Sequence, residues 1–178
     1  MGRFRNGWNT WTATAKKAAQ SSPGANTTRP MEVNVSSIDM KLEVVTLPVS
    51  DVDRAKSFYQ SLGWRFDIDL VVSDDLRTVQ ITPPHSECSI QFGKGITTAE
   101  PGSAQGLILV VDDIDAARDG LVGRGVDVSE VAEQRPPGLD APEGERSYFA
   151  RATFSDPDGN RWVLQEITTR LPGREWED

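Results

Sequence analysis

The two side chains best suited to chemistry near neutral pH, an imidazole and a thiol, each occur once, as His85 and Cys88. His85 lies in Pro83-Pro84-His85-Ser86, a pattern typical of a turn. One histidine cannot build a histidine-rich metal site, and we favour a surface-loop histidine over a ligand or general base. Cys88 alone is more typical of a small half-buried hydrophobic residue than of a nucleophile. A single cysteine also excludes an intrachain disulfide, which favours a reducing cytoplasm as the location.

Bulk composition narrows the class of protein. The chain has 178 residues, of which 37% are hydrophobic and 26% charged, which indicates a globular protein of one domain or two small fused modules. The net charge of -8 argues against a nucleic-acid partner, because the phosphate backbone attracts basic surfaces. No apolar run approaches the roughly 20 residues that a membrane-spanning helix needs, so no membrane partner is expected.

Residues 1–40 differ from the rest in being basic and rich in small polar residues. They lack the apolar stretch of about 7–15 residues that a secretory signal contains. An organelle transit peptide remains an alternative, but we favour a disordered leader, or a true start at Met31 or Met40. This segment is therefore left out of the fold prediction.

A repeat organises the remainder. Val49–Lys56 (VSDVDRAK) returns 62 residues later as Val111–Arg118 (VDDIDAAR), and Gly63 meets Gly125 at the same offset. Each copy has an apolar strand pattern, a helix that opens on acidic residues and a glycine stop. We predict two β-α-β-β-β modules at 41–94 and 105–168, a linker at 95–104 and a flexible tail at 169–178.

The individual elements follow from period-two and helical spacing. In the first module a strand around 44–49 and a helix between Asp51 and Gly63 precede further strands. In the second, a long loop at Gln134–Arg146 either forms a lid or is a solvated excursion. The remaining predicted elements are strands at Trp64–Asp69, Arg77–Thr82, Cys88–Gly93, Gly106–Val111, Val126–Val131, Tyr148–Phe154 and Arg161–Ile167, a helix from Asp113 to about Arg124, and a hairpin turn at Ser155–Asn160.

These motifs resemble the vicinal oxygen chelate superfamily, which contains glyoxalases, bleomycin-resistance proteins and extradiol dioxygenases. The carriers are Val49–Ala55 with Phe58-Tyr59 and Leu62-Gly63-Trp64, then Val111–Ala117, Arg124-Gly125-Val126 and Asp156–Asn160. The resemblance covers about 41–168. It implies an α+β fold in which two tandem modules form a mixed-sheet cleft, and it also implies a homodimer.

The resemblance further implies a divalent metal held by histidine or glutamate from the first and last strand of each module. The matching positions are Val44, Gln91, Gly106 and Val163. Valine and glycine have no donor atom, and one glutamine is a weak ligand, so we expect no metal and no other cofactor. A register shift by one residue would offer Glu43 and Glu166. Such a shift reverses the face of a strand, so we expect these two as solvent-facing or edge carboxylates.

Strand alternation divides the predicted sheet residues into two faces. One face is strongly apolar and is expected under the helices: Val45, Leu47, Ile81, Ile90, Phe92, Leu107, Leu109, Val111, Trp162 and Leu164. The other mixes aliphatic, hydroxyl and amide side chains, which suits a small-molecule pocket, although an ordinary solvated or partner-covered face is an alternative. It carries Val44, Thr46, Gln80, Thr82, Ser89, Gln91, Ile108, Val110, Val163 and Gln165.

From this lining we predict a ligand site made by Thr46, Gln80, Gln91, Ile108, Val163 and Gln165, with Arg151 able to steer an anionic group. No titratable side chain is predicted in the lining itself, so no catalytic residue is assigned. The favoured function is binding of a small organic ligand in the cleft. A metal-dependent lyase, isomerase or dioxygenase with non-standard ligands, and a non-catalytic interaction module, are the alternatives.

Overall fold

The computed structural model describes residues 40–135 and 144–170. The chain divides into two compact units, Met1–Met40 and Lys41–Asp178. The predicted leader at 1–40 (Met40 apart), most of the loop at 134–146 and the tail beyond Arg170 lie outside the described residues. Over the described ranges, no helix is long and apolar enough to cross a membrane.

Both helices begin and end where the repeat predicts. Helix α2 (Val52–Ser61) starts after Asp51, whose carboxylate accepts hydrogen bonds from the backbone N–H groups of Asp53 and Arg54 at 3.0 Å each. Helix α3 (Ile114–Val122) starts after Asp113, which accepts from the backbone N–H of Ala116 at 2.9 Å. Gly63 and Gly125 follow the helices with φ angles of 81° and 84°, a conformation that side chains disfavour.

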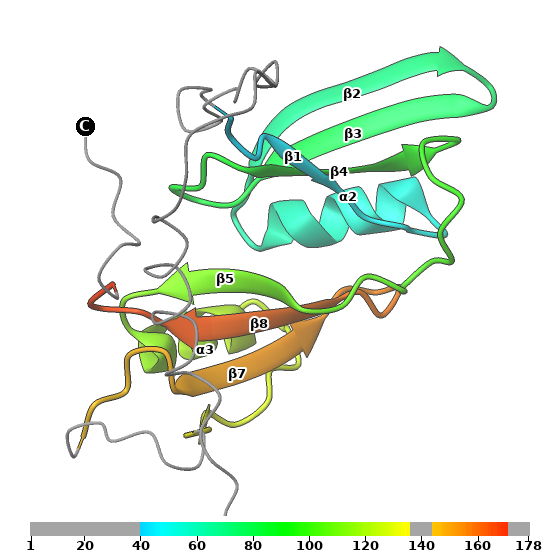
Figure 1. Ribbon diagram of the computed structural model, residues 1–178. Helices are drawn as coiled ribbons and strands as arrows, with labels where there is room; N and C mark the ends of the chain where they lie inside the picture. Colours follow the sequence, from blue (N-terminus) through cyan, green and yellow to red (C-terminus); the bar gives the residue numbers. More distant parts are fainter. Residues whose placement is uncertain (1–39, 136–143, 171–178) are drawn as a thin grey trace, which may run out of the picture. The chain divides into compact units, whose positions relative to one another are not determined.

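Each module forms its own four-stranded sheet (Figure 1), and together they confirm the α+β fold of two β-α-β-β-β modules. In each sheet the first strand pairs parallel with the last, and the remaining pairs are antiparallel. The first sheet has the order β1-β4-β3-β2, with β1 Val44–Thr46, β2 Arg65–Ser73, β3 Leu76–Thr82 and β4 Ser89–Lys94. The second has the order β5-β8-β7-β6, with β5 Leu107–Val111, β6 Ala132–Glu133, β7 Ala150–Ser155 and β8 Arg161–Glu166.

The strand predicted at Val126–Val131 is wrong. In this segment only Val128 makes a bridge, to Phe154, and the regular strand β6 is a two-residue element that begins at Ala132. The backbone N–H of Thr153 donates to the hydroxyl of Ser129 instead of a carbonyl, so a side chain replaces part of the ladder. The alternation of Val126 and Val128 reflects their burial in the core, at 8% and 6% exposed.

One hydrophobic core joins the two modules, and aromatic rings form its centre. Trp162 of β8 meets Trp64 of the first module edge-on, with ring centroids 5.2 Å apart. It also contacts Tyr59 of α2 at 6.2 Å and stacks on Phe154 of β7 at 6.2 Å. Such pairs add about 0.5–1.5 kcal/mol beyond the area that they bury. The predicted apolar face of each sheet therefore packs into a shared interior.

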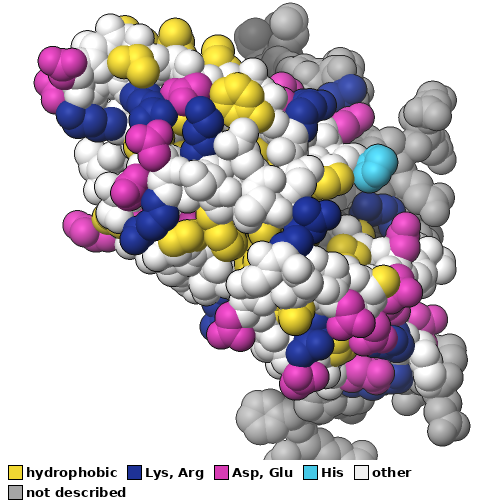
Figure 2. Space-filling model, turned by 180° about the vertical axis from the view of Figure 1, so that it is seen from behind, with side chains coloured by type: hydrophobic (Ala, Val, Ile, Leu, Met, Phe, Trp, Pro, Cys, Tyr) yellow, Lys and Arg dark blue, Asp and Glu magenta, His cyan; other side chains and the backbone are white. Residues whose placement is uncertain are grey.

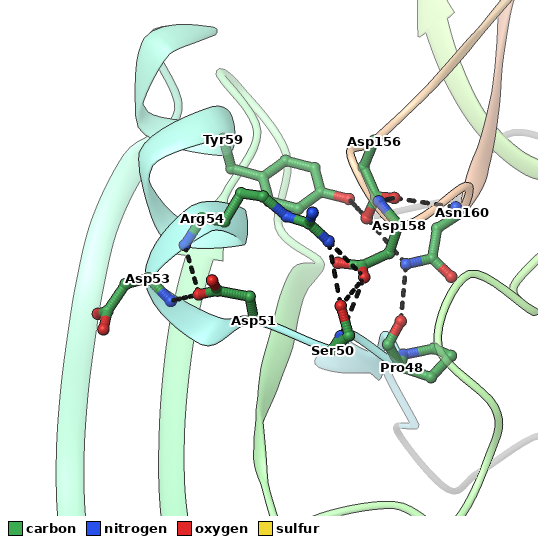
Figure 3. A network of polar contacts seen from close by, with 9 residues as sticks. All are labelled: Pro48, Ser50, Asp51, Asp53, Arg54, Tyr59, Asp156, Asp158 and Asn160. Carbon is green, nitrogen blue, oxygen red and sulfur yellow. Dashed lines mark hydrogen bonds and ion pairs between the residues drawn. The ribbon is translucent and has the colours of Figure 1, made fainter.

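A buried polar network crosses this core (Figure 3). The Tyr59 hydroxyl donates to Oδ2 of Asp156 at 2.9 Å. It also accepts from Nε1 of Trp162 at 3.2 Å. Asn160 donates to the same carboxylate oxygen at 2.8 Å. Burial, followed by the negative charge of Asp156, raises the pKa of Tyr59 far above its ordinary value, so the phenol remains a neutral donor.

The turn at Asp156–Asn160 is more than the hairpin that the sequence predicts, because it also holds the first module. Nδ2 of Asn160 donates to the carbonyl of Pro48 at 2.9 Å, and the backbone N–H of Ala104 donates to Oδ1 of Asn160 at 3.1 Å. Oδ1 of Asp158 accepts from the backbone N–H of Ser50 at 3.0 Å and from Arg54 at 2.8 Å. Hydrogen bonds and aromatic packing thus hold the two modules together at one contact. We call this contact, made by Pro48, Tyr59, Asp156, Asn160 and Trp162, the joint.

Replacing Tyr59 with phenylalanine tests this joint. The change removes one oxygen atom and leaves Nε1 of Trp162 without its partner, so we expect a loss of about 1–3 kcal/mol in the free energy of unfolding. Urea denaturation measures the loss. Ser57→Ala on the exposed side of the same helix is the matched control, expected within about 0.5 kcal/mol of the original chain. Equal stability of Tyr59→Phe and the original chain would contradict the role given to the network.

Candidate ligand-binding faces

The first sheet presents a polar face on the side opposite to the core. Register pairs Val44 with Ser89, Thr46 with Gln91 and Gln80 with Gln91, so their side chains point to one side. The alternate residues of the same strands, such as Ile81, Ile90 and Phe92, are buried in the core. We call this surface the polar face, and it consists of Val44, Thr46, Gln80, Thr82, Ser89 and Gln91.

The second sheet presents a more aliphatic face, also directed away from the core. Ile108 is paired with Val163, and Val110 and Arg151 are both paired with Gln165. Ile108 is 53% exposed and Val110 45% exposed, which leaves an apolar strip uncovered in the single chain. We call this surface the aliphatic face, and it consists of Ile108, Val110, Arg151, Thr153, Val163 and Gln165.

All seven residues predicted to bind a ligand lie on these two faces. Thr46, Gln80 and Gln91 are together on the polar face, and Nε2 of Gln91 donates to the Thr46 hydroxyl at 2.7 Å. The aliphatic face holds the other four, Ile108, Arg151, Val163 and Gln165. Gln165 is only 5% exposed there, and its Nε2 donates to the carbonyl of Tyr148 at 2.7 Å. The structure brings each subset together on its own sheet, and both subsets point away from the core that joins the modules.

Sequence reasoning missed a carboxylate that a strand brings to the polar face. The register of β2 on β3 shifts between Phe66, paired with Ile81, and Ile68, paired with Gln80, so Asp67 is an extra residue at a β-bulge. Lys56 of α2 lies over the Phe66 ring and forms an ion pair with Asp69 at 2.8 Å. These contacts place Phe66 and Asp69 on the side of the sheet that faces α2. Asp67 instead accepts a hydrogen bond from Thr82 on the polar face. Simple alternation places Asp67 and Asp69 on one face, and only the bulge separates them.

Asp67 is held by its neighbours as an ionised group. Nε of Arg65 donates to its Oδ1 at 2.6 Å, and the Thr82 hydroxyl donates to its Oδ2. Burial pushes the pKa of Asp67 upward, but hydrogen bonds from Arg65 and Thr82 outweigh burial and leave the pKa below its usual value. A carboxylate with a lowered pKa is a weak general base at neutral pH, so the arrangement is better suited to binding than to proton abstraction.

The residues at the family's metal positions do not fit a metal. Val44 and Val163 carry no donor atom, Gly106 has no side chain, and Gln91 offers a single neutral amide oxygen. Across residues 40–135 and 144–170, no three His, Cys, Asp or Glu side chains gather in a way that could hold an ion.

The other side chains considered as metal ligands do not belong to the polar or the aliphatic face. Glu166 is only 7% exposed on a central strand, and its Oε2 accepts from the backbone N–H of Ile114 at 3.1 Å, so the prediction of a solvent-facing or edge carboxylate is wrong for this residue. It serves the start of α3 instead. Glu43 is exposed, as is His85, coloured cyan in Figure 2. Cys88 is half-buried as predicted, and burial, then the charge of Glu43, raises the pKa of its thiol.

Comparison with known proteins agrees with this architecture. Residues 41–164 match the family described as the Glyoxalase/Bleomycin resistance protein/Dioxygenase superfamily. A search of curated proteins found no match. TnmS3, described as an antibiotic binding protein from Streptomyces sp. CB03234, is 31% identical, with 72% of this chain and 97% of that chain covered and a TM-score of 0.58. A superfamily member from Sphaerobacter thermophilus DSM 20745 is 30% identical, with 72% and 98% covered and a TM-score of 0.57.

Metal content tests the chemistry of these faces. We expect the purified protein to contain far less than one Ni, Zn, Fe or Mn ion per chain, because the side chains at the four family positions lack suitable donors. Elemental analysis measures the content, and melting with and without EDTA serves as a control that should show no shift. A near-stoichiometric metal that EDTA removes with a loss of stability would contradict this interpretation.

Proposed function

The chain belongs to the Glyoxalase/Bleomycin resistance protein/Dioxygenase superfamily, and from that premise we propose that it binds a small organic ligand without turnover and without a metal. The observation that carries the proposal is the pair of outward faces, where amides and hydroxyls stand among aliphatic side chains. Small-molecule sites have this composition, an apolar wall with a few polar groups that fix orientation. The similarity to an antibiotic binding protein supports binding as the activity.

In this proposal the module boundaries are those of the repeat. Residues 41–94 and 105–168 each supply one face, and 95–104 connects them. The single half-buried thiol at Cys88 is compatible with a reducing cytoplasm, which we keep as the proposed location.

We further propose that a second copy of the chain closes the site. The core and the polar network bind the two modules of one chain through their inner sides, so the polar and aliphatic faces of that chain point apart. A two-fold dimer can set the polar face of each copy against the aliphatic face of the other and so create two equivalent sites. Ile68 and Leu70, paired with Gln80 and Thr78 of β3 and 45% and 50% exposed, extend the apolar surface beside the polar face.

Ligand binding is tested by thermal shift with a panel of aromatic and thiol-conjugate compounds, followed by mass spectrometry of the mixture. We expect stabilisation without product, which amounts to about 2.7 kcal/mol when the ligand is at 100 times its Kd. Gln91→Leu should weaken the best ligand about tenfold through loss of a polar contact. Gln60→Leu on the exposed surface of α2 is the matched control. Absence of any stabilising compound, or formation of product, would contradict the proposal.

The dimer is tested with two valines of equal exposure. Val110 on the aliphatic face and Val122 on α3 are each 45% exposed. Val110→Glu should place an unpaired charge inside the contact and raise the dimer dissociation constant at least tenfold, whereas Val122→Glu should leave it unchanged. Sedimentation velocity across a concentration series measures both. A monomeric original chain, or equal effects of the two substitutions, would contradict the proposed contact.

A further inference from the structure

Three side chains of the polar face, Gln80, Ser89 and Thr82, form one continuous hydrogen-bonded chain that ends at the carboxylate of Asp67. Nε2 of Gln80 donates to the Ser89 hydroxyl at 3.2 Å, and the Ser89 and Thr82 hydroxyl oxygens lie 2.8 Å apart. Thr82 donates to Oδ2 of Asp67, whose other oxygen accepts from Arg65 at 2.6 Å. Thr82 and Ser89 are 2% and 4% exposed, so water has little access to the middle of this chain.

The ionised carboxylate determines the direction of every hydrogen bond in the chain. A carboxylate only accepts, so the single hydroxyl proton of Thr82 is committed to Asp67. Thr82 must then accept from Ser89, and Nη2 of Arg65 donates to its remaining lone pair at 3.2 Å. The proton of Ser89 is committed in turn, which leaves Ser89 as an acceptor for the amide nitrogen of Gln80.

This direction fixes the orientation of the Gln80 amide. A flipped amide would set its carbonyl oxygen against a Ser89 oxygen that has no proton to offer, a contact between two acceptors. The N–H groups of Gln80 therefore face inward, toward Ser89. The carbonyl oxygen of Gln80 has no protein donor among the described residues and is the group left for a ligand.

The neighbouring glutamine is not fixed in this way. Gln91 is the cross-strand partner of Gln80, and among the described residues its amide is hydrogen-bonded only to the Thr46 hydroxyl, at 2.7 Å. A threonine hydroxyl both donates and accepts, so this pair can reverse its hydrogen bond and offer a ligand either an N–H or a carbonyl. The polar face therefore combines one adaptable amide with one amide of fixed direction.

We propose that the chain from Asp67 through Thr82 and Ser89 sets the ligand specificity of this face, by presenting the carbonyl of Gln80 to a hydrogen-bond donor on the ligand. The inference rests on the proposed function and narrows its ligand class to organic molecules with a hydroxyl or N–H group at that point. A ligand that buries the Gln80 carbonyl without donating to it leaves an unpaired acceptor, which lowers affinity by about tenfold or more. Asp67, Thr82 and Ser89 act through Gln80 as positioning residues.

The isosteric substitution Asp67→Asn should reverse the chain. Nε of Arg65 continues to donate toward position 67, so the asparagine carbonyl takes that side and its NH₂ group faces Thr82. Thr82 then donates to Ser89, Ser89 donates to the side chain of Gln80, and the Gln80 amide flips to present N–H groups outward. The substitution thus keeps shape while it inverts the hydrogen-bonding character of the site.

Two probes that share the naphthalene ring measure this effect: 2-naphthol, which donates a hydrogen bond, and its methyl ether 2-methoxynaphthalene, which only accepts. For the original chain we expect 2-naphthol to bind about tenfold more tightly, and for Asp67→Asn we expect the ratio of the two Kd values to fall to about one or below. Asp74→Asn, which removes the same charge from the exposed β2–β3 turn, is the matched control and should keep the tenfold ratio. Circular dichroism verifies that the variants are folded.

Equal affinity of the two probes for the original chain, or an unchanged ratio in Asp67→Asn, would overturn the inference and leave the proposed function intact. Failure of both probes to bind would instead count against the proposed ligand class. Neutron diffraction from the ligand-free deuterated protein tests the direction independently. We expect deuterium on Thr82 toward Asp67 and on Ser89 toward Thr82, and a Gln80 carbonyl facing Ser89 would overturn the inference without any ligand.

Discussion

The contact between Tyr59 and Asp156, inside the aromatic cluster around Trp162, is the constraint on which the rest of this structure depends. It joins helix α2 of the first module to the last hairpin of the second, and Asn160 extends the same joint to Pro48 and Ala104. Because the modules are bound through their inner sides, the residues that we propose to bind a ligand lie on the outer sides of the two sheets. The joint is thus structural, yet it decides where function can lie.

The sequence alone predicts most of the scaffold. Asp51, Asp113, Gly63 and Gly125 act at helix ends through local backbone geometry, so the 62-residue repeat locates both helices correctly. The assignment of sheet residues to inner and outer faces also holds, because alternation is a local property as long as register is regular. Alternation fails just beyond Asp67, where a bulge in the pairing of β2 with β3 turns Ile68 to the polar face and Asp69 to the side that faces α2.

Two other departures have the same origin in tertiary contacts. Val126 and Val128 alternate like a strand, but they anchor a segment in which a serine hydroxyl substitutes for a backbone carbonyl. By residue type Glu166 is expected to be a surface carboxylate. It is buried instead, because it accepts a hydrogen bond from the backbone N–H of Ile114 at the start of α3. The fold is shared by members with different chemistries, so the outer faces rather than the family name carry the functional argument. The four family metal positions lack a charged or imidazole donor, because two are valine, one is glycine and the fourth is the neutral amide of Gln91.

We propose above all that the outer faces of the two sheets form the ligand site. The most direct measurement is amide and side-chain chemical-shift mapping by NMR during titration with the best stabilising compound. We expect the largest changes at Thr46, Gln80 and Gln91 on one sheet and at Ile108, Val163 and Gln165 on the other, with α2 and α3 little affected. Changes confined to the helices, or to one sheet alone, would contradict this proposal.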